Sequence, residues 1–172
     1  MASQSEKPLI LISSCLLGMA TRYDGRSKPA PVILSELGSH VSWLPVCPEA
    51  DSGMGTPRPP IRVIRQVDGS IGLVRPADGF DPAPMLRAWI ERTLPALLSR
   101  RPDAAILKAR SPSCGLKTVA VLDAKQPGVT FPGDGLFAAA LRQAAPELPI
   151  VDENDLATPE QCQQFLQQLT QR

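Results

Sequence analysis

The sequence has little that would allow strong electrostatic binding or insertion into a membrane. Its 172 residues include 18 lysines and arginines against 17 aspartates and glutamates, so the formal net charge is only +1. A charge this small predicts no general attraction to nucleic acid or to anionic membranes. The apolar run at 9–12 is much shorter than the roughly 20 residues that cross a bilayer. We therefore expect a cytoplasmic protein that does not bind membranes.

Histidine and cysteine are both scarce, which restricts the possible kinds of active site. His40 is the only histidine, so it has no companion for a histidine-based triad or zinc motif. The four cysteines do not form the dense framework of a disulfide-rich secreted domain, and we expect reduced thiols. Cys162 has helical spacing relative to Phe165, Leu166 and Leu169, which predicts a packing role for this thiol.

Apolar runs alternate with helical patterns along the chain. We expect strands at 9–14, 41–46, 104–108, 118–122 and 149–151, a hairpin at 61–66 and 71–75, a rigid loop at 48–60, and helices at 31–38, 83–100, 134–144 and from 158 onward. Such alternation favours an α/β fold with a mainly parallel sheet and helices on both faces. The length fits a single domain, residues 8–172, after a short tail, residues 1–7.

Three cysteines come directly after predicted strands. Cys15 lies at the exit of the first strand, Cys47 follows the second, and Cys114 lies in the loop after 104–108. Because open parallel sheets place their sites at the carboxyl ends of the strands, we expect the three thiols along one edge. Three thiolates suit zinc, another soft metal or an iron-sulfur cluster. The alternative is ordinary buried thiols, since free cysteine is often a small core residue.

Polar residues accompany these cysteines. Glu49, two residues after Cys47, is either a surface carboxylate or a general acid or base beside a metal. Ser111 and Ser113 come just before Cys114, and they are either turn formers or hydroxyl donors to a substrate. At this point the residues alone leave both interpretations open.

Five motifs in chain order resemble the thiouracil desulfidase family. They are Cys15-Leu16-Leu17-Gly18, Arg22-Tyr23-Asp24-Gly25, Val46-Cys47-Pro48-Glu49, Thr56-Pro57-Arg58-Pro59-Pro60, and the segment 107–115 with Ser111-Pro112-Ser113-Cys114-Gly115. Five blocks at compatible separations, over roughly residues 8–151, are far more specific than any single block. The resemblance implies a Rossmann-like single domain whose three cysteines bind a 4Fe-4S cluster.

The resemblance also implies roles for individual residues. Cys15, Cys47 and Cys114 would be the cluster ligands, and Glu49 and Ser111 would be the catalytic residues. The implied activity is that of an iron-sulfur-dependent desulfidase acting on a small thiolated pyrimidine such as 2-thiouracil. The implied reaction is a non-redox hydrolysis at the open iron of the cluster, which gives uracil and hydrosulfide.

Other functions would use the same ligands. One is a zinc-dependent hydrolase, and another is a non-enzymatic iron-sulfur carrier or sulfur-sensing module, which would have little need for Glu49. The chain carries Ile61-Arg62 where many relatives have an acidic residue, and Asp81-Pro82 is also less typical of the family. The substrate therefore stays open among a free base, a nucleoside, a nucleotide and thiolated RNA, although the small net charge disfavours a large nucleic-acid footprint. The sequence predicts no oligomeric state.

Overall fold

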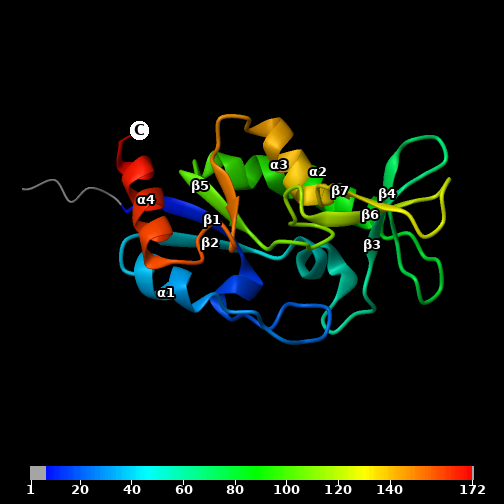
Figure 1. Ribbon diagram of the computed structural model, residues 1–172, viewed down its shortest axis with the longest axis horizontal. Coiled ribbons are helices and arrows are strands. Elements are labelled where there is room, and N and C mark those ends of the chain that lie inside the picture. Colours follow the sequence, from blue (N-terminus) through cyan, green and yellow to red (C-terminus); the bar gives the residue numbers. More distant parts are fainter. Residues whose placement is uncertain (1–6, 172) are drawn as a thin grey trace, which may run out of the picture.

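Four parallel strands form the first sheet of the computed structural model, which describes residues 7–171 (Figure 1). Their order is β2-β1-β5-β8, and their bounds are β1 (Leu9–Ser13), β2 (Ser42–Val46), β5 (Ala104–Leu107) and β8 (Ile150–Asp152). Every pairing in this sheet is parallel. The predicted α/β class is therefore confirmed. Residues 1–6 of the predicted tail lie outside the described residues, and the single-domain boundary stays a prediction.

Burial explains which strands are central. All four residues of β5 and most of β1 are buried, as expected for parallel strands covered on both faces. The edge strand β2 is more exposed and contains Pro45, whose missing amide hydrogen is tolerated at an edge. The predicted strands thus differ in composition according to their position in the sheet.

Two pairs of helices cover the two faces of this sheet, as predicted. Helices α1 (Pro31–Leu37) and α4 (Pro159–Thr170) pack against Ile10, Ile12 and Ile106 on one face. Helices α2 (Ala83–Ser99) and α3 (Leu136–Ala144) share the other core with Leu11 and Leu107. Figure 1 shows the strands between these two helical layers. Within residues 7–171, none of the helices combines the length and apolarity that a membrane span requires.

A second sheet of four strands continues the structure at one end, with the order β4-β3-β6-β7. It contains β3 (Arg62–Arg65), β4 (Ile71–Val74), β6 (Val119–Asp123) and β7 (Thr130–Gly133). The predicted hairpin is β3 and β4, and β6 lies parallel to β3. Strand β7, antiparallel to β6, was not predicted, because Pro132 and Gly133 interrupt its pattern.

Two short helical segments also differ from the predictions. A 3-10 helix, η1 (Ser14–Leu17), begins directly after β1, and Gly18 ends it with a left-handed φ of 89°. The segment 48–60, predicted to be a loop without regular structure, contains the helical turn η2 (Ala50–Met54). That prediction was wrong because several prolines and glycines of the segment come after η2 rather than within it.

The strand order creates a switch point between β1 and β5. The chain passes from β1 to its neighbour β2 on one side, and then returns across β1 to place β5 on the other side. In open α/β sheets, ligands bind outside the carboxyl ends of the strands at such a point. Cys15, Cys47 and the loop that contains Cys114 all follow strands at this end of the sheet.

Gly135, the residue before α3, allows the Cys114 loop to pack closely against that helix. The amides of Phe137 and Ala138 donate to the Ser113 carbonyl oxygen at 2.9 and 3.0 Å. A Cβ atom added to Gly135 would lie 2.5 Å from the carbonyl carbon and oxygen of Ser113. Because both atoms belong to the backbone, the loop itself would have to move.

We therefore expect Gly135→Ala to lower the free energy of unfolding by about 1–3 kcal/mol, as overpacking of a filled interior does. Urea denaturation of the metal-free chain would measure this change. Gly72→Ala is the matched control, because its added Cβ would meet the end of the flexible Gln66 side chain at 3.2 Å. A loss for Gly135→Ala no larger than that of the control would contradict the close packing of the loop against α3.

Candidate active site

A cavity of about 330 Å³ lies at the carboxyl ends of β1, β2 and β5. Its wall includes all three predicted cluster ligands, Cys15, Cys47 and Cys114, together with the predicted catalytic residues Glu49 and Ser111. The fold therefore brings these five residues together, although they come from three separate segments of the chain.

Each cysteine is held by the backbone around it. The carbonyl oxygen of Cys15 accepts a hydrogen bond from the amide of Lys28 at 3.0 Å, which fixes η1 against the following loop. The amide of Cys47 donates to Asp51 Oδ2 at 2.9 Å, and its thiol lies 3.5 Å from the carbonyl oxygen of Thr21. The Cys114 loop is anchored to the start of α3. Local hydrogen bonds thus fix the segments that carry the three thiols.

Burial strongly disfavours the thiolate form of two of these cysteines. Loss of solvent, with a smaller effect of the neighbouring Cys47, raises the pKa of Cys15 to about 11, although Lys108 acts to lower it. Burial also raises the pKa of Cys114 to about 12, against the hydrogen bonds of Ser13 and Ser113, which lower it. Because metal ligands must be thiolates, a bound group would need to supply positive charge that compensates for this burial.

The candidate ligands in the described part of the chain are not grouped as in a site for a single metal ion. Within residues 7–171, no three histidine, cysteine, aspartate or glutamate side chains are grouped so that they could hold one ion. In a tetrahedral zinc site, the Zn–S bonds of about 2.3 Å bring the sulfurs to within about 3.8 Å of each other. The cysteines of a 4Fe-4S cluster bind different irons and surround a larger body. Three cysteines around one cavity therefore fit a cluster better than a zinc ion.

Thr21, in the loop after β1, has one buried hydroxyl without a partner within residues 7–171. Its Oγ1 atom is buried and has no hydrogen-bond partner in the described part of the chain. Buried hydroxyl groups nearly always have a partner, and each exception requires an explanation. Thr21 lines the same cavity as the three cysteines.

Glu49 is buried, with 6% of its surface exposed, and both of its carboxylate oxygens have partners. Oε2 accepts from Arg58 Nε at 2.9 Å, and Oε1 accepts from Ser113 Oγ at 2.9 Å. Arg58 Nη1 also donates to the carbonyl oxygens of Thr21 and Gly55, both at 3.0 Å. The guanidinium therefore connects the loop after β1 to the segment after β2, and it holds the carboxylate between them.

Two hydroxyl groups continue this network toward Cys114. The Ser111 Oγ atom accepts hydrogen bonds from the amides of Ser113 and Cys114, at 3.3 and 3.1 Å. The Ser111 and Ser113 hydroxyl oxygens lie 3.1 Å apart. Both serines line the cavity, but Ser113 is buried whereas Ser111 is only partly buried.

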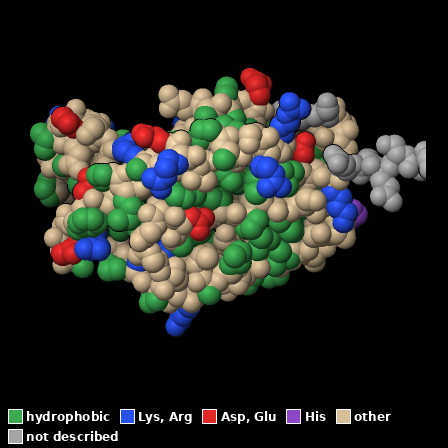
Figure 2. Space-filling model, turned by 180° about the vertical axis from the view of Figure 1, so that it is seen from behind, with side chains coloured by type: hydrophobic (Ala, Val, Ile, Leu, Met, Phe, Trp, Pro, Cys, Tyr) green, Lys and Arg blue, Asp and Glu red, His purple; other side chains and the backbone are tan. Residues whose placement is uncertain are grey.

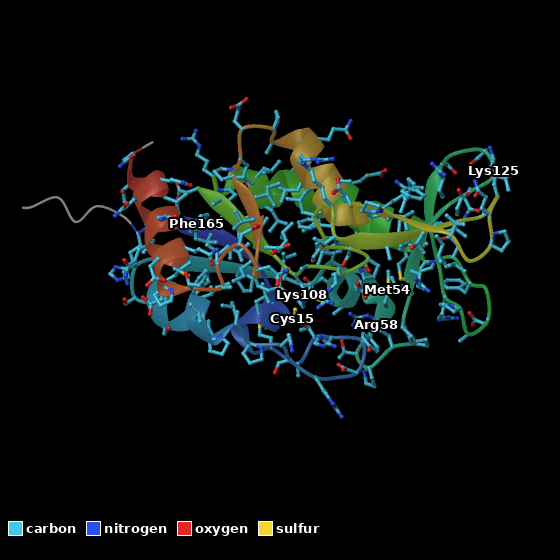
Figure 3. All side chains as sticks on the ribbon, viewed as in Figure 1. Cys15, Met54, Arg58, Lys108, Lys125 and Phe165 are labelled. Atoms are coloured by element: carbon cyan, nitrogen blue, oxygen red, sulfur yellow. The ribbon has the colours of Figure 1, made fainter. Side chains whose placement is uncertain are left out.

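Charged and aromatic side chains complete the cavity wall. Figure 3 shows Lys108 next to Cys15, with Arg58 on the side toward η2 and Met54. The Lys108 ammonium group pairs with Glu153, which follows β8 and also accepts from the amide of Ala109. Arg22 and Tyr23 lie on the wall formed by the loop after β1 and form a cation–π contact, with the guanidinium carbon 5.6 Å from the ring centroid.

The structure also separates the predicted site residues from the others. His40 is exposed, and Cys162 is fully buried in the core beneath α1 and α4, which confirms its predicted packing role. The sequence patterns assign no separate role to Arg58, Thr21 or Glu153. Arg58 had one signal, its place within a proline-rich motif. Thr21, through its carbonyl oxygen, and Glu153 have partners that lie too far away in the sequence to be recognised locally.

Comparisons with known proteins show which family this chain is similar to. The family model described as 2-thiouracil desulfurase matches residues 10–153. The uncharacterized protein YbbK of Bacillus subtilis (strain 168) is 32% identical over 152 residues, which cover 86% of this chain and 97% of that protein. A solved structure described as the 4Fe-4S-dependent thiouracil desulfidase TudS is similar with a TM-score of 0.70 and 33% identity, and the match covers 94% of this chain and 98% of that one.

The buried ion pair of Glu49 and Arg58 leads to a test of stability. Arg58→Met removes the positive charge and leaves the carboxylate buried without its partner. We expect the free energy of unfolding of the metal-free chain to fall by about 3–5 kcal/mol, the usual result of breaking a buried pair on one side. Urea denaturation would measure this loss.

The double variant Glu49→Gln/Arg58→Met provides the control for this test. Because the glutamine side chain carries no charge, the double variant should recover much of the stability that Arg58→Met loses. If the losses of the two single variants simply add, the pair does not act through charge compensation and this interpretation of the contact is wrong.

Proposed function

Because the chain belongs to the 2-thiouracil desulfurase family, we propose that it removes sulfur from a small thiolated pyrimidine such as 2-thiouracil by non-redox hydrolysis. The predicted family, the enzyme class of iron-sulfur-dependent thiouracil desulfidases and the 4Fe-4S cofactor are confirmed by the match to TudS. The observation that carries the proposed reaction is the convergence of three thiols and a buried, paired carboxylate on one cavity.

Cys15, Cys47 and Cys114 are the proposed cluster ligands. They line one cavity, and they are not grouped as the ligands of a single ion within residues 7–171. When bound through three cysteines, a 4Fe-4S cluster supplies one iron without a protein ligand, a Lewis acid for the sulfur of the substrate. Lys108 lies close enough to Cys15 to favour its thiolate, and its own position is fixed by Glu153.

Glu49 is the proposed general base. Its carboxylate would accept a proton from the water that attacks the thiocarbonyl carbon, while Arg58 holds the carboxylate in place. The oxygen of the product comes from this water, and the carbon–sulfur bond breaks. The sulfur leaves as hydrosulfide, and the oxidation states of carbon and sulfur do not change. Ser111 would hydrogen-bond the substrate as charge develops on it.

The size and charge of the site support a small substrate. A cavity of about 330 Å³ is at the lower end of the range for small-molecule sites. Arg22 and Tyr23 offer charged and planar contacts to a heterocycle at its wall. On the face shown in Figure 2, basic and acidic side chains are interspersed and form no broad basic stripe. These features favour a free base or another small thiolated pyrimidine over thiolated RNA.

The two alternative functions explain fewer of these features. A zinc hydrolase would require the cysteines to converge on one ion, a grouping that is absent within residues 7–171. A carrier or sensor of iron-sulfur clusters would have little need to bury a carboxylate and pair it with both Arg58 and Ser113. Both features favour an enzyme with a cluster.

The proposed ligands can be tested by cofactor content. After anaerobic reconstitution, the unmodified chain should contain iron and acid-labile sulfide in the ratio of a 4Fe-4S cluster. Cys15→Ser, Cys47→Ser and Cys114→Ser should each lose most of it, because serine is a poor ligand for cluster iron. Cys162→Ser, in the core beneath α4, is the control and should load normally. Normal loading of any of the first three variants would remove that cysteine from the ligand set.

The proposed catalytic residues can be tested by turnover. With 2-thiouracil as substrate, we expect uracil and sulfide in equal amounts from the reconstituted chain. Glu49→Gln and Ser111→Ala should each lower kcat by about 10²-fold or more while the cluster content is unchanged. A chain that binds the cluster but leaves 2-thiouracil intact would refute the substrate proposal, and full activity without a cluster would refute the mechanism.

A further inference from the structure

Ser113 lies at the centre of the polar network in the cavity, although the proposed reaction gives it no role. Only 2% of its surface is exposed. Its hydroxyl lies 2.9 Å from Glu49 Oε1 and 3.1 Å from Ser111 Oγ, and therefore joins the two proposed catalytic side chains. Its backbone carbonyl accepts the amides of Phe137 and Ala138, which fixes the residue to the start of α3.

The direction of the hydrogen bond between Ser113 and Glu49 follows from counting hydrogens. A hydroxyl group has one hydrogen, and an ionised carboxylate has none. Glu49 forms a salt bridge with Arg58, so the hydrogen in the Ser113–Glu49 contact belongs to Ser113. The sulfur of Cys114 is a more distant acceptor, 3.8 Å from Ser113 Oγ, and a carboxylate is the stronger one.

The same count fixes the direction at Ser111. Its oxygen already accepts two backbone amides, those of Ser113 and Cys114, which occupy both lone pairs. The Ser113 hydrogen is directed to Glu49, so the hydrogen between the two hydroxyls is that of Ser111. The network therefore has one polarity, from Ser111 to Ser113 to Glu49.

We propose that Ser113 is a positioning residue whose hydroxyl orients the Glu49 carboxylate and accepts the hydrogen of Ser111. In the free enzyme, Ser111 donates to Ser113, and when a substrate enters, this hydrogen turns to an acceptor on the substrate. Ser113 continues to donate to Glu49 throughout. This inference rests on the proposed function, because it assigns Ser113 to the same reaction.

Ser113→Ala removes the hydroxyl and little else from a buried position. In the reconstituted chain, we expect kcat for 2-thiouracil to fall roughly 10- to 100-fold, the usual cost of losing a group that orients a reacting one. KM should change less than about threefold, and iron and sulfide content should stay the same. Loss of activity in proportion to loss of the cluster would overturn the proposal, because it would show a purely structural role.

Ser52→Ala is a matched control, because it also removes a serine hydroxyl that contacts Glu49. The Ser52 hydroxyl also donates to Glu49 at 2.9 Å, but to its backbone carbonyl rather than its carboxylate. We expect kcat within about threefold of the unmodified chain. If Ser52→Ala lowers kcat as much as Ser113→Ala does, the contact of Ser113 with the Glu49 carboxylate does not explain the loss of activity.

Two further measurements separate the proposal from its premise. In the Ser111→Ala/Ser113→Ala double variant, losses that are clearly less than multiplicative are expected, because the two hydroxyls act as one unit. Multiplicative losses would overturn the proposal.

A crystal structure of Ser113→Ala needs no turnover and should show the Glu49 carboxylate turned or disordered relative to the unmodified chain. An unchanged Glu49 would overturn the positioning role, whereas an unmodified chain inactive on 2-thiouracil would overturn only the proposed function.

Discussion

The buried ion pair between Glu49 and Arg58 is the contact on which the geometry of the cavity depends. Its side chains are only 8% and 6% exposed, so both charges have lost most of their hydration. Such a pair often contributes little net stability, because desolvation offsets the attraction. Arg58 offsets part of the desolvation cost with further hydrogen bonds, to the loop after β1 and to the turn beside η2. The pair therefore serves to hold a carboxylate at a fixed place inside a cavity.

The parallel sheet supplies the frame for this pair. Three loops leave the sheet at one end, and the switch point between β1 and β5 leaves a crevice between them. Each loop brings one cysteine, and each is fastened by a different device: the 3-10 turn at Cys15, the bond from the Cys47 amide to Asp51, and the close approach of Gly135 to the Cys114 loop. The regular strands determine where the loops begin, and irregular local contacts determine the positions of the thiols.

This division explains how much could be predicted from the sequence. The buried strands, the helices on both faces and the shared edge of the cysteines follow from apolar patterns, which depend on neighbours in the chain. Strand β7 could not be predicted from such patterns, because Pro132 is accommodated in a strand only through the pairing with β6. The family motifs pointed to Glu49 and Ser111, but no pattern could reveal that Ser113 lies between them. That contact joins residues 64 positions apart and exists only after the loops have met.

The burial of the thiols shows why the cavity suits a charged cofactor. A site made only for stability would gain from neutral thiols in an apolar pocket, and burial raises the pKa of both Cys15 and Cys114, which favours their neutral forms. However, the same cavity contains the carboxylate of Glu49, which is costly to bury. The three cysteines would hold a cluster as thiolates, and its positively charged iron would compensate for the burial of these thiolates. The three thiols thus suit the cavity to a cofactor, and the buried carboxylate suits it to chemistry rather than to stability.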